Sequence, residues 1–427
     1  MTHFGIICPA ATGYLNPMTT VGFELKQRGH RVSVINIFDV RSKAIAAGLE
    51  FIVVGKSEFP PGSTEDLSIE LDNLNGLEAF KYTIHQWMTN SANVVLRDAP
   101  EAIETAGIDA LLVDQVCAEG STIAEYLNIP FITVCNALMV NRDVTVPPFI
   151  TSWNYDPTRT GILRNRAGYA LLDRVGKPLL KVISDYRSRW GLSLDRDRVK
   201  IYSSLAQISQ QPPEFEFPRQ ELPSCFHFLG PLSNPIRESI SFPFEKLTGQ
   251  PIIYVCLGRL QNRVWIVQAI AQACACFLNV QLVISLGGVS PESLPQLPAN
   301  PIVVDYAPQL ELLPTPTALT ITHAGMNTVL ESLSNGVPMV AIPITNDQPG
   351  VAARIAWTVT GNVVPLKKVS VENLRRAIEQ VLRKDTYKNN ALRLQESIKQ
   401  AGGVRKAANI IEQAIITKKP VLANSNN

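Results

Sequence analysis

ALTITHAGMNTVLESLSNG, residues 318–336, begins with an apolar run, continues through a short turn with a glycine and ends in a helix-like run closed by a second glycine. This order is typical of a buried parallel strand whose following turn presents backbone amides at a helix N-terminus. Unpaired N–H groups and the positive end of the helix dipole favour an anion there, and Gly325 lets the backbone come close to it. Taken alone, these residues also fit a plain strand–helix junction with Thr322 as N-cap and His323 in the core.

Polar side chains in the neighbouring segments make this junction a candidate ligand site. Asn327 and Thr328 can donate to an anion, and Glu331 lies one helical turn after Asn327, where a carboxylate can accept from paired hydroxyls such as those of a ribose. Tyr306-Ala307-Pro308-Gln309 precedes the motif, and Asp347-Gln348 follows the apolar run MVAIPI. In an α/β sheet all three loops lie at the carboxyl ends of strands, where ligands bind.

Short apolar runs alternate with longer amphipathic segments in both halves of the 427-residue chain. This is the βαβ rhythm of a doubly wound sheet, and the length exceeds what one hydrophobic core organises. The run FLGPLSNPIRESISFPF, residues 228–244, has the Pro and Ser content of a linker. We therefore expect an α/β fold with a Rossmann-like domain over residues 1–232, a linker over 233–248 and a second Rossmann-like domain over 249–427. The last helices are expected to pack back towards the first domain, and the two domains to face each other across a cleft.

The bulk composition excludes several classes of protein. With 46% hydrophobic residues, 18% charged residues and a formal net charge of +2, the chain is an ordinary globular protein without a basic track for nucleic acid. Its seven cysteines are an odd number lying mostly in apolar runs, which indicates reduced thiols and a cytoplasmic protein. No secretion signal or bilayer-spanning run is recognisable. We expect a monomer, with peripheral membrane contact left open.

A metal or other cofactor is not expected. The triplet Asp195-Arg196-Asp197 has the acidic spacing that binds a divalent metal in one class of enzymes, but its charged surroundings are typical of a solvated turn.

Residues 306–353 resemble the nucleotide-sugar signature of the UDP-glycosyltransferases, glycosyltransferase family 1, whose GT-B fold consists of two Rossmann-like domains. The similarity extends from GYLNP at residues 13–17 through FLGPL at residues 228–232 to the final helices. The resemblance implies a set of donor-binding residues. These are Tyr306 and Gln309 at the uracil, His323, Gly325, Asn327 and Thr328 at the diphosphate, Glu331 at the ribose, Asp347 and Gln348 at the sugar hydroxyls, and Ala307, Met326 and Gly13 in the same site.

Two residues depart from the family pattern on the donor side. Members usually have Trp where Tyr306 stands, and the smaller ring still offers a stacking face. Arg259 follows Leu257-Gly258 where the family usually has Ser or Thr. Its guanidinium either clamps a phosphate bidentately or points to solvent, and the sequence leaves both alternatives open.

A third departure concerns the group that removes a proton. The family's catalytic histidine is replaced by Tyr14, and a phenol with a pKa near ~10 is poorly suited to accept the proton of an attacking hydroxyl at neutral pH. Asp114 matches the carboxylate that usually orients the histidine. It is therefore predicted to take the proton of the attacking hydroxyl, either directly or through water. Two alternatives are a Tyr14 whose pKa is lowered by its surroundings and an acceptor acidic enough to need little help.

The segment NALMVNRDVTVPPFITSWNY, residues 136–155, combines aromatic residues with prolines and predicts an apolar acceptor pocket. Its predicted lining residues are Asn136, Phe149, Trp153 and Tyr155. The alternative is a loop that packs its aromatic rings on its own domain. The segment is similar to that of bacterial glycosyltransferases acting on carotenoids and other natural products.

The resemblance therefore implies an inverting transferase that moves a hexose from a UDP-sugar to a hydroxyl of a small lipophilic acceptor. The expected hexose is glucose. The alternative, motivated by Tyr14, is a catalytically impaired glycosyltransferase-like binding or activator protein.

Overall fold

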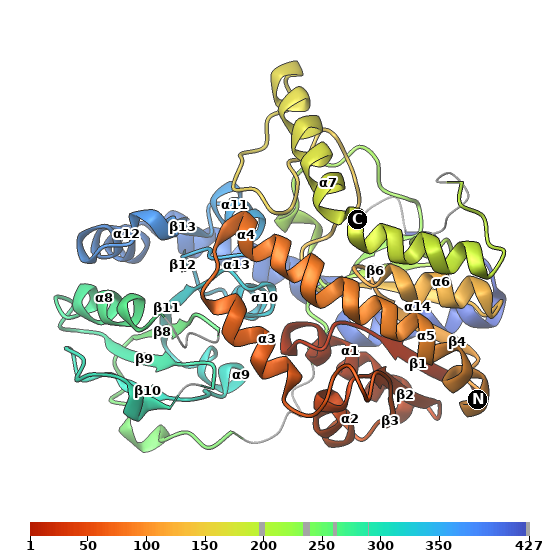
Figure 1. The fold of residues 1–427 in the computed structure, drawn as a ribbon. Coiled ribbons are helices and arrows are strands. Elements are labelled where there is room, and N and C mark those ends of the chain that lie inside the picture. The colour runs from red at the N-terminus through yellow and green to blue at the C-terminus, as the bar shows by residue number, and fades with distance from the viewer. Residues whose placement is uncertain (196–200, 234–239, 259–262, 289, 424–427) are drawn as a thin grey trace.

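The computed structural model describes residues 1–195, 201–233, 240–258, 263–288 and 290–423. Within these residues it contains two separate parallel sheets (Figure 1). The first has the strand order β3-β2-β1-β4-β5-β6-β7 and the second the order β10-β9-β8-β11-β12-β13. Both orders reverse beside the first strand of the sheet, as in doubly wound folds. The expectation of two Rossmann-like sheets is confirmed.

The strands are short and apolar because parallel sheets are covered by helices on both faces. In the first sheet they are β1 His3–Ile7, β2 Arg31–Asn36, β3 Glu50–Val53, β4 Ala110–Asp114, β5 Phe131–Cys135, β6 Gln207–Ser209 and β7 Phe226–Phe228. In the second they are β8 Ile252–Cys256, β9 Gln281–Ser285, β10 Ile302–Val304, β11 Thr317–Thr322, β12 Met339–Ala341 and β13 Gly361–Val363. The sheets thus divide the chain between Phe228 and Ile252.

The helices follow the same alternation. Those of the first half are α1 Thr12–Gln27, α2 Arg41–Ala46, α3 Ser63–Asp72, α4 Gly76–Tyr82, the π-helix η2 Thr83–Met88, α5 Thr89–Ala106, α6 Ala118–Tyr126 and α7 Arg159–Arg189. Those of the second half are α8 Val264–Cys274, α9 Gln309–Leu312, α10 Met326–Ser334, α11 Gln348–Trp357, α12 Val371–Arg383, α13 Asp385–Ala401 and α14 Gly403–Thr417. Short 3₁₀ turns occupy Phe38–Val40, Pro213–Phe215, Phe244–Lys246, Pro291–Ser293 and Leu366–Lys368.

The last helix returns to the first domain. Ala407 and Ile411 of α14 are fully buried in the same core as the strands of the first sheet. Glu412 of α14 accepts hydrogen bonds from Arg28, at 2.7 Å, and from His30, at 3.0 Å. In Figure 1 the label of α14 accordingly lies among those of the first half, next to α5 and α6. The two domains are therefore joined by this helix as well as by the segment between the sheets.

The carboxyl ends of the two sheets meet at the centre of the molecule. Tyr14 and Asn136 follow β1 and β5, whereas Gly258, His323 and Asn346 follow β8, β11 and β12. All five residues line cavities between the domains. This is the edge at which doubly wound sheets bind ligands, because the strand order reverses there.

Candidate functional site

A cavity of about 670 Å³ opens between the two domains at the carboxyl ends of the strands. It brings together every described residue that the sequence predicted for the donor. From the second domain it is lined by Tyr306, Ala307, Gln309, His323, Gly325, Met326, Asn327, Thr328, Glu331, Asp347 and Gln348, and from the first domain by Gly13. Arg259 lies outside the described residues.

The turn between β11 and α10 is shaped by its small residues. A Cβ atom on Gly325 would lie 2.6 Å from Nε2 of His323, so only glycine leaves room for the imidazole. Ala324 has φ of 67°, a left-handed conformation that is strained for a residue with a side chain. Gly325 is the N-cap of α10 and no side chain caps that end. The free amides at the start of α10 therefore face the cavity as an anion site.

His323 is held beneath this turn in a neutral state. Its Nδ1 atom lies 3.4 Å from the carbonyl oxygen of Cys256, and burial lowers the pKa of the imidazole to about 4. Because the carbonyl can only accept, Nδ1 carries the hydrogen in this contact. The Nε2 atom is the one beside Gly325, at the cavity edge of the ring.

A hydrogen-bonded group of side chains forms the far end of the same cavity. The amide of Gln309 donates to the buried carboxylate of Glu331. Its carbonyl oxygen accepts from the hydroxyls of Tyr254, at 3.2 Å, and Thr328, at 3.4 Å. Tyr306 remains 52% exposed at the rim. A polar, preorganised pocket thus lies next to an accessible aromatic face.

Asn327 connects the donor motif to the first domain. Its amide nitrogen donates to the carbonyl of Gly13 at 3.0 Å, and its side-chain oxygen accepts from Gln210 at 2.9 Å. Asp347 likewise accepts from the backbone N–H of Leu138 at 3.1 Å. These residues, predicted from sequence only as ligand contacts, therefore also hold the two domains together.

Other contacts also join the two domains. Arg263 donates to the backbone carbonyls of Asp72 and Leu74, at 3.0 and 2.8 Å, and thereby binds the end of α3 to the second domain. Thr83 donates to the side chain of Asn346 at 3.3 Å. The wall formed by α3 and α4 is consequently fixed against the loops that carry the donor residues.

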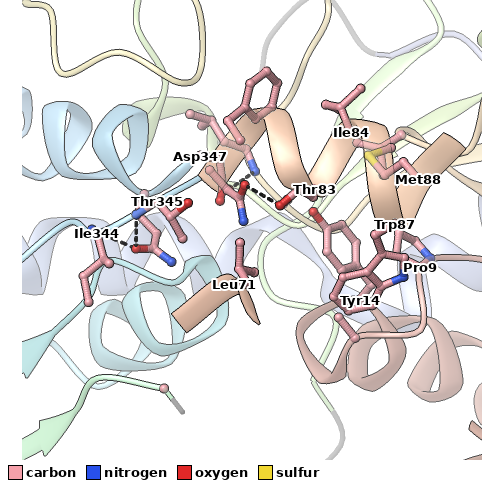
Figure 2. Close-up of a pocket in the computed structure, with 18 of the residues that line it drawn as sticks. Pro9, Tyr14, Leu71, Thr83, Ile84, Trp87, Met88, Ile344, Thr345 and Asp347 are labelled. Atoms are coloured by element: carbon pink, nitrogen blue, oxygen red, sulfur yellow. Dashed lines mark hydrogen bonds between the residues drawn. The ribbon is translucent and has the colours of Figure 1, made fainter. Parts of the chain in front are cut away.

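A second cavity of about 360 Å³ adjoins the first, and Tyr14, His323 and Asp347 line both. Its remaining wall is mainly apolar. Figure 2 shows Leu71, Ile84, Trp87 and Met88 from the helices of the first domain around this space. Phe80, Leu138 and Phe149 belong to the same apolar lining. An apolar space therefore opens directly onto the polar one.

The helical wall of the second cavity was not assigned from the sequence. Its π-helix carries Thr83, Ile84, Trp87 and Met88, all of which line the cavity. π-helical turns are rare and occur mostly at functional sites. The signal available in the sequence was an apolar stripe: Ile84 follows Phe80 by four residues, and Trp87 and Met88 follow Ile84 by three and four, which places these side chains on one helical face.

The four residues predicted for the acceptor pocket separate into two groups. Phe149 lines the apolar cavity, and Asn136 lines the polar one. Trp153 and Tyr155 line neither. The guanidinium of Arg164 lies 4.9 Å from the Trp153 ring centre, and Tyr155 stacks on Phe217 at 5.7 Å. For these two rings the expected lining role is wrong, because the loop packs them against the protein instead.

Tyr14 does not have the lowered pKa that one prediction required. Burial raises the pKa of its phenol well above the ordinary value, and the nearby carboxylates of Asp347 and Asp114 raise it further. The Tyr14 hydroxyl therefore stays protonated at neutral pH. This corrects the alternative in which Tyr14 itself takes a proton.

Asp114 is buried behind Tyr14 and is fully hydrogen-bonded. One oxygen accepts from the backbone N–H of Val116 at 2.9 Å and the other from Asn136 at 2.6 Å. Burial raises the pKa of Asp114 to about 7 in spite of these bonds. The residue is 1% exposed and lines neither cavity. A carboxyl with this pKa can exchange a proton near neutral pH, but only through an intervening group.

Glu119 is a second carboxyl that the sequence interpretation missed. It lies in the first turn of α6, is 5% exposed and lines the apolar cavity. Burial raises its pKa to about 7, whereas its own N–H and the thiol of Cys117 lower it. It forms no ion pair with any described residue. Burying a carboxyl without a cationic partner costs folding free energy. Such a group in a cavity is therefore a candidate for a functional role.

The described residues contain no group of three His, Cys, Asp or Glu side chains arranged to hold a metal ion. Asp197 of the acidic triplet lies outside the described residues. None of the described helices combines the length and apolar composition needed to cross a membrane.

The comparisons with known proteins all identify glycosyltransferases as similar to this chain. The family model "UDP-glucoronosyl and UDP-glucosyl transferase" matches residues 75–402. Zeaxanthin glucosyltransferase of Pantoea ananas is 32% identical over 100% of this chain and 99% of its own. The 4'-demethylrebeccamycin synthase of Lentzea aerocolonigenes is 26% identical over 94% and 96% of the two chains. The solved structure of the calicheamicin glycosyltransferase has a TM-score of 0.73 at 20% identity, over 98% of this chain and 100% of its own, and so shares the fold.

Proposed function

Because the chain belongs to the UDP-glucoronosyl and UDP-glucosyl transferase family, it is a UDP-sugar-dependent glycosyltransferase of the GT-B fold, and we propose that it transfers glucose to a hydroxyl of a lipophilic acceptor. The observation that carries the proposal is the junction of the two cavities. A polar cavity suited to a nucleotide sugar opens into an apolar one, and both share Tyr14, His323 and Asp347. The assignment of glucose draws on relatives whose names specify glucosyl transfer.

In this proposal the donor occupies the polar cavity. The uracil stacks on Tyr306, and the ribose hydroxyls donate to Glu331. The diphosphate accepts from the free amides at the start of α10 and lies beside His323. Asp347 accepts from hydroxyls of the sugar. Support comes from the buried carboxylate of Glu331 and from the uncapped N-terminus of α10, which suit a diol and an anion respectively.

The acceptor enters the apolar cavity with its hydroxyl towards Tyr14. Its oxygen attacks the anomeric carbon, the bond from that carbon to the UDP oxygen breaks, and the hydroxyl proton passes to a base. The amides of α10 stabilise the charge that develops on the departing diphosphate. Holding both reactants at the junction of the cavities lowers the entropic part of the barrier.

Asp114 is our proposed proton acceptor, acting through water. Its raised pKa suits the role, and its burial behind the cavity wall makes an intervening water necessary. Glu119 is the competing carboxyl because it lines the acceptor cavity itself. The protonated phenol of Tyr14 remains available as a hydrogen-bond partner for the acceptor oxygen.

The test is transfer from UDP-glucose to a panel of lipophilic alcohols, with glycoside and free UDP measured together. We expect glycoside and UDP in equal amounts with at least one extended apolar alcohol. Transfer from another UDP-hexose at a higher rate would overturn the assignment of glucose, and transfer to hydrophilic sugars alone would overturn the lipophilic acceptor.

A second candidate function follows from Tyr14. A transferase without its usual histidine, and with a phenol of raised pKa in that place, also fits a protein that binds a nucleotide sugar without transferring it. UDP binding measured by calorimetry, together with no turnover on any acceptor, would favour this candidate. Recovery of transfer by Tyr14→His would show that the site had lost only its base.

A further inference from the structure

The long helix α7 carries an exposed stripe that the transfer reaction does not use. Arg159, Leu163, Arg166, Ala170, Arg174 and Lys177 follow each other at intervals of three or four residues, so they share one helical face. All six are exposed. We call these residues the basic stripe. Four of its six members are cationic and none is acidic.

No described residue neutralises the cations of the basic stripe. Arg159, Arg166, Arg174 and Lys177 form no ion pair with any described residue. The nearest acidic residue along the helix, Asp173, accepts instead from Arg142. A concentrated positive charge therefore projects from a protein whose formal net charge is only +2. Such a surface attracts an anionic partner.

Exposed leucines within and beside the basic stripe indicate what kind of partner it fits. Leu163 is 68% exposed, Leu171 42% and Leu180 44%. An anionic partner without an apolar region, such as nucleic acid, would leave these leucine side chains without apolar contacts. The interface of an anionic bilayer accommodates both, because cations contact the lipid headgroups while leucines reach the acyl boundary.

The opposite face of α7 lies behind the wall of the acceptor cavity. Val175 and Leu179 are buried in one cluster with Phe80 and Ile84, and the latter two line that cavity. Phe149, another lining residue, packs against the same cluster. The basic stripe and the acceptor cavity are thus separated by a single layer of helices. Figure 1 shows α7 rising above the rest of the molecule, where a flat surface can reach it.

From this arrangement we propose that the basic stripe of α7 docks the enzyme on an anionic lipid bilayer. The bound state places the acceptor cavity close to the membrane in which a lipophilic acceptor resides. The use of the docked state in catalysis rests on the proposed function, whereas docking itself rests only on α7. No helix needs to enter the hydrocarbon core for this contact, in keeping with the absence of a membrane-spanning helix among the described residues.

The experiment is vesicle flotation of the full chain with two lipid compositions. We expect binding to vesicles of phosphatidylcholine mixed with phosphatidylglycerol, little binding to phosphatidylcholine alone, and release by high salt. The double variant Arg166→Gln/Arg174→Gln should bind the anionic vesicles roughly tenfold or more weakly, because each cation near such a surface contributes separately. Leu163→Ser should weaken binding by a smaller factor and leave the salt dependence unchanged.

The matched control is Arg375→Gln/Arg393→Gln, which removes two exposed cations from the second domain. It should float as the unmodified protein does. Docking is overturned if the unmodified protein does not bind anionic vesicles or if both double variants lose binding equally. It is also overturned if nucleic acid competes with the vesicles for the protein while Leu163→Ser has no effect on vesicle binding. Thermal melting of each variant shows whether a loss reflects unfolding.

Transfer assays separate this inference from the proposed function. With the acceptor in detergent micelles, the stripe variant should be as active as the unmodified protein, and with the acceptor in anionic vesicles it should be slower. Transfer in micelles without vesicle binding would leave the function standing and remove the docking. Vesicle binding without transfer to any lipophilic alcohol would leave the docking standing and remove the proposed function.

Discussion

The two halves of the candidate site are built in different ways. The donor half consists of residues that follow neighbouring parallel strands, and its side chains bond to each other, as Gln309 does to Glu331. The acceptor half consists of helices that cross over the first sheet, and its wall includes the π-helix Thr83–Met88. In the first half the buried carboxylate of Glu331 accepts a hydrogen bond from Gln309, whereas in the second half the buried carboxyl of Glu119 forms no ion pair with any described residue.

The two ways of building suit two tasks, anion binding in the first half and acceptor choice in the second. Sheet edges and a helix N-terminus supply a rigid anion site that any member of a nucleotide-sugar family can reuse. Helices packed over a sheet can change their lining residues without disturbing the strands, so acceptor choice can diverge there. In the proposed mechanism proton removal takes place in the second half, which is where Tyr14 departs from the family pattern.

The largest expected effect concerns the carboxyl that receives the proton. If Asp114 is the base, Asp114→Asn should lower kcat by about 10²–10⁴-fold, because a positioned base contributes that much. Glu119→Gln should then lower kcat far less. UDP binding should be unchanged in both variants, since neither residue lines the donor cavity. Steady-state kinetics with a saturating donor, together with calorimetry of UDP binding, makes the measurement.

The pH dependence gives an independent check on the same residue. A base works in its deprotonated form, so kcat/KM should rise with pH and level off above about 7, the raised pKa of both Asp114 and Glu119. The variant that removes the true base should lose this rise. If Glu119→Gln flattens the profile and Asp114→Asn does not, the proton acceptor is Glu119 and our assignment is wrong.

A smaller effect is expected for the donor half. Glu331→Ala should weaken UDP binding by about 10–100-fold, because hydrogen bonds to a buried charged group contribute roughly 1.5–3 kcal/mol. The loss should appear as a higher KM for the donor with an unchanged KM for the acceptor. Glu379→Ala, which removes an exposed carboxylate on α12, is the matched control. Equal losses in the two variants would remove the assigned role of Glu331.

The contrast also explains how much the sequence could predict. The donor residues after Tyr306 lie within one stretch, and their placement follows from strand ends that the βαβ rhythm locates. The wall at Trp87 depends on a π-helix and on α4 crossing to the second domain, neither of which a local pattern contains. The aromatic content of residues 136–155 predicted a lining but not the direction of each ring, which packing on Phe217 and Arg164 decides.

The same limit applies to charges and to contacts between domains. Tyr14 was compatible with a lowered or a raised pKa until its neighbours were placed; burial raises the pKa, and the nearby carboxylates of Asp347 and Asp114 raise it further. Asn327 was predicted from its motif, but its bond to Gly13 joins residues far apart in the chain. Such features arise only when both domains are assembled.

In the acceptor half, Trp87→Ala should affect the acceptor more than UDP, although the ring also lines the polar cavity. Removing a large apolar ring from the cavity wall loses roughly 1.5–3 kcal/mol of contact with an apolar acceptor, which corresponds to a KM about 10–100-fold higher. UDP binding should weaken by a smaller factor, because the variant leaves the donor residues of the second domain unchanged. Trp265→Ala removes an exposed tryptophan on α8 and is the control. A loss of UDP affinity as large as the rise in the acceptor KM would mean that Trp87 serves both halves equally.

The smallest effect on activity is expected for Tyr155→Ala, although Tyr155 belongs to the segment predicted to line the acceptor pocket. Its ring stacks on Phe217 at 5.7 Å and meets Trp357 edge-on at 5.4 Å, outside both cavities. The variant should lose about 1–3 kcal/mol of stability from the two aromatic contacts, with an unchanged KM for the acceptor. Phe149→Ala, in the same segment but lining the cavity, should raise that KM. Denaturant unfolding and acceptor kinetics of the two variants test the division directly, because a raised KM in Tyr155→Ala would place its ring at the acceptor after all.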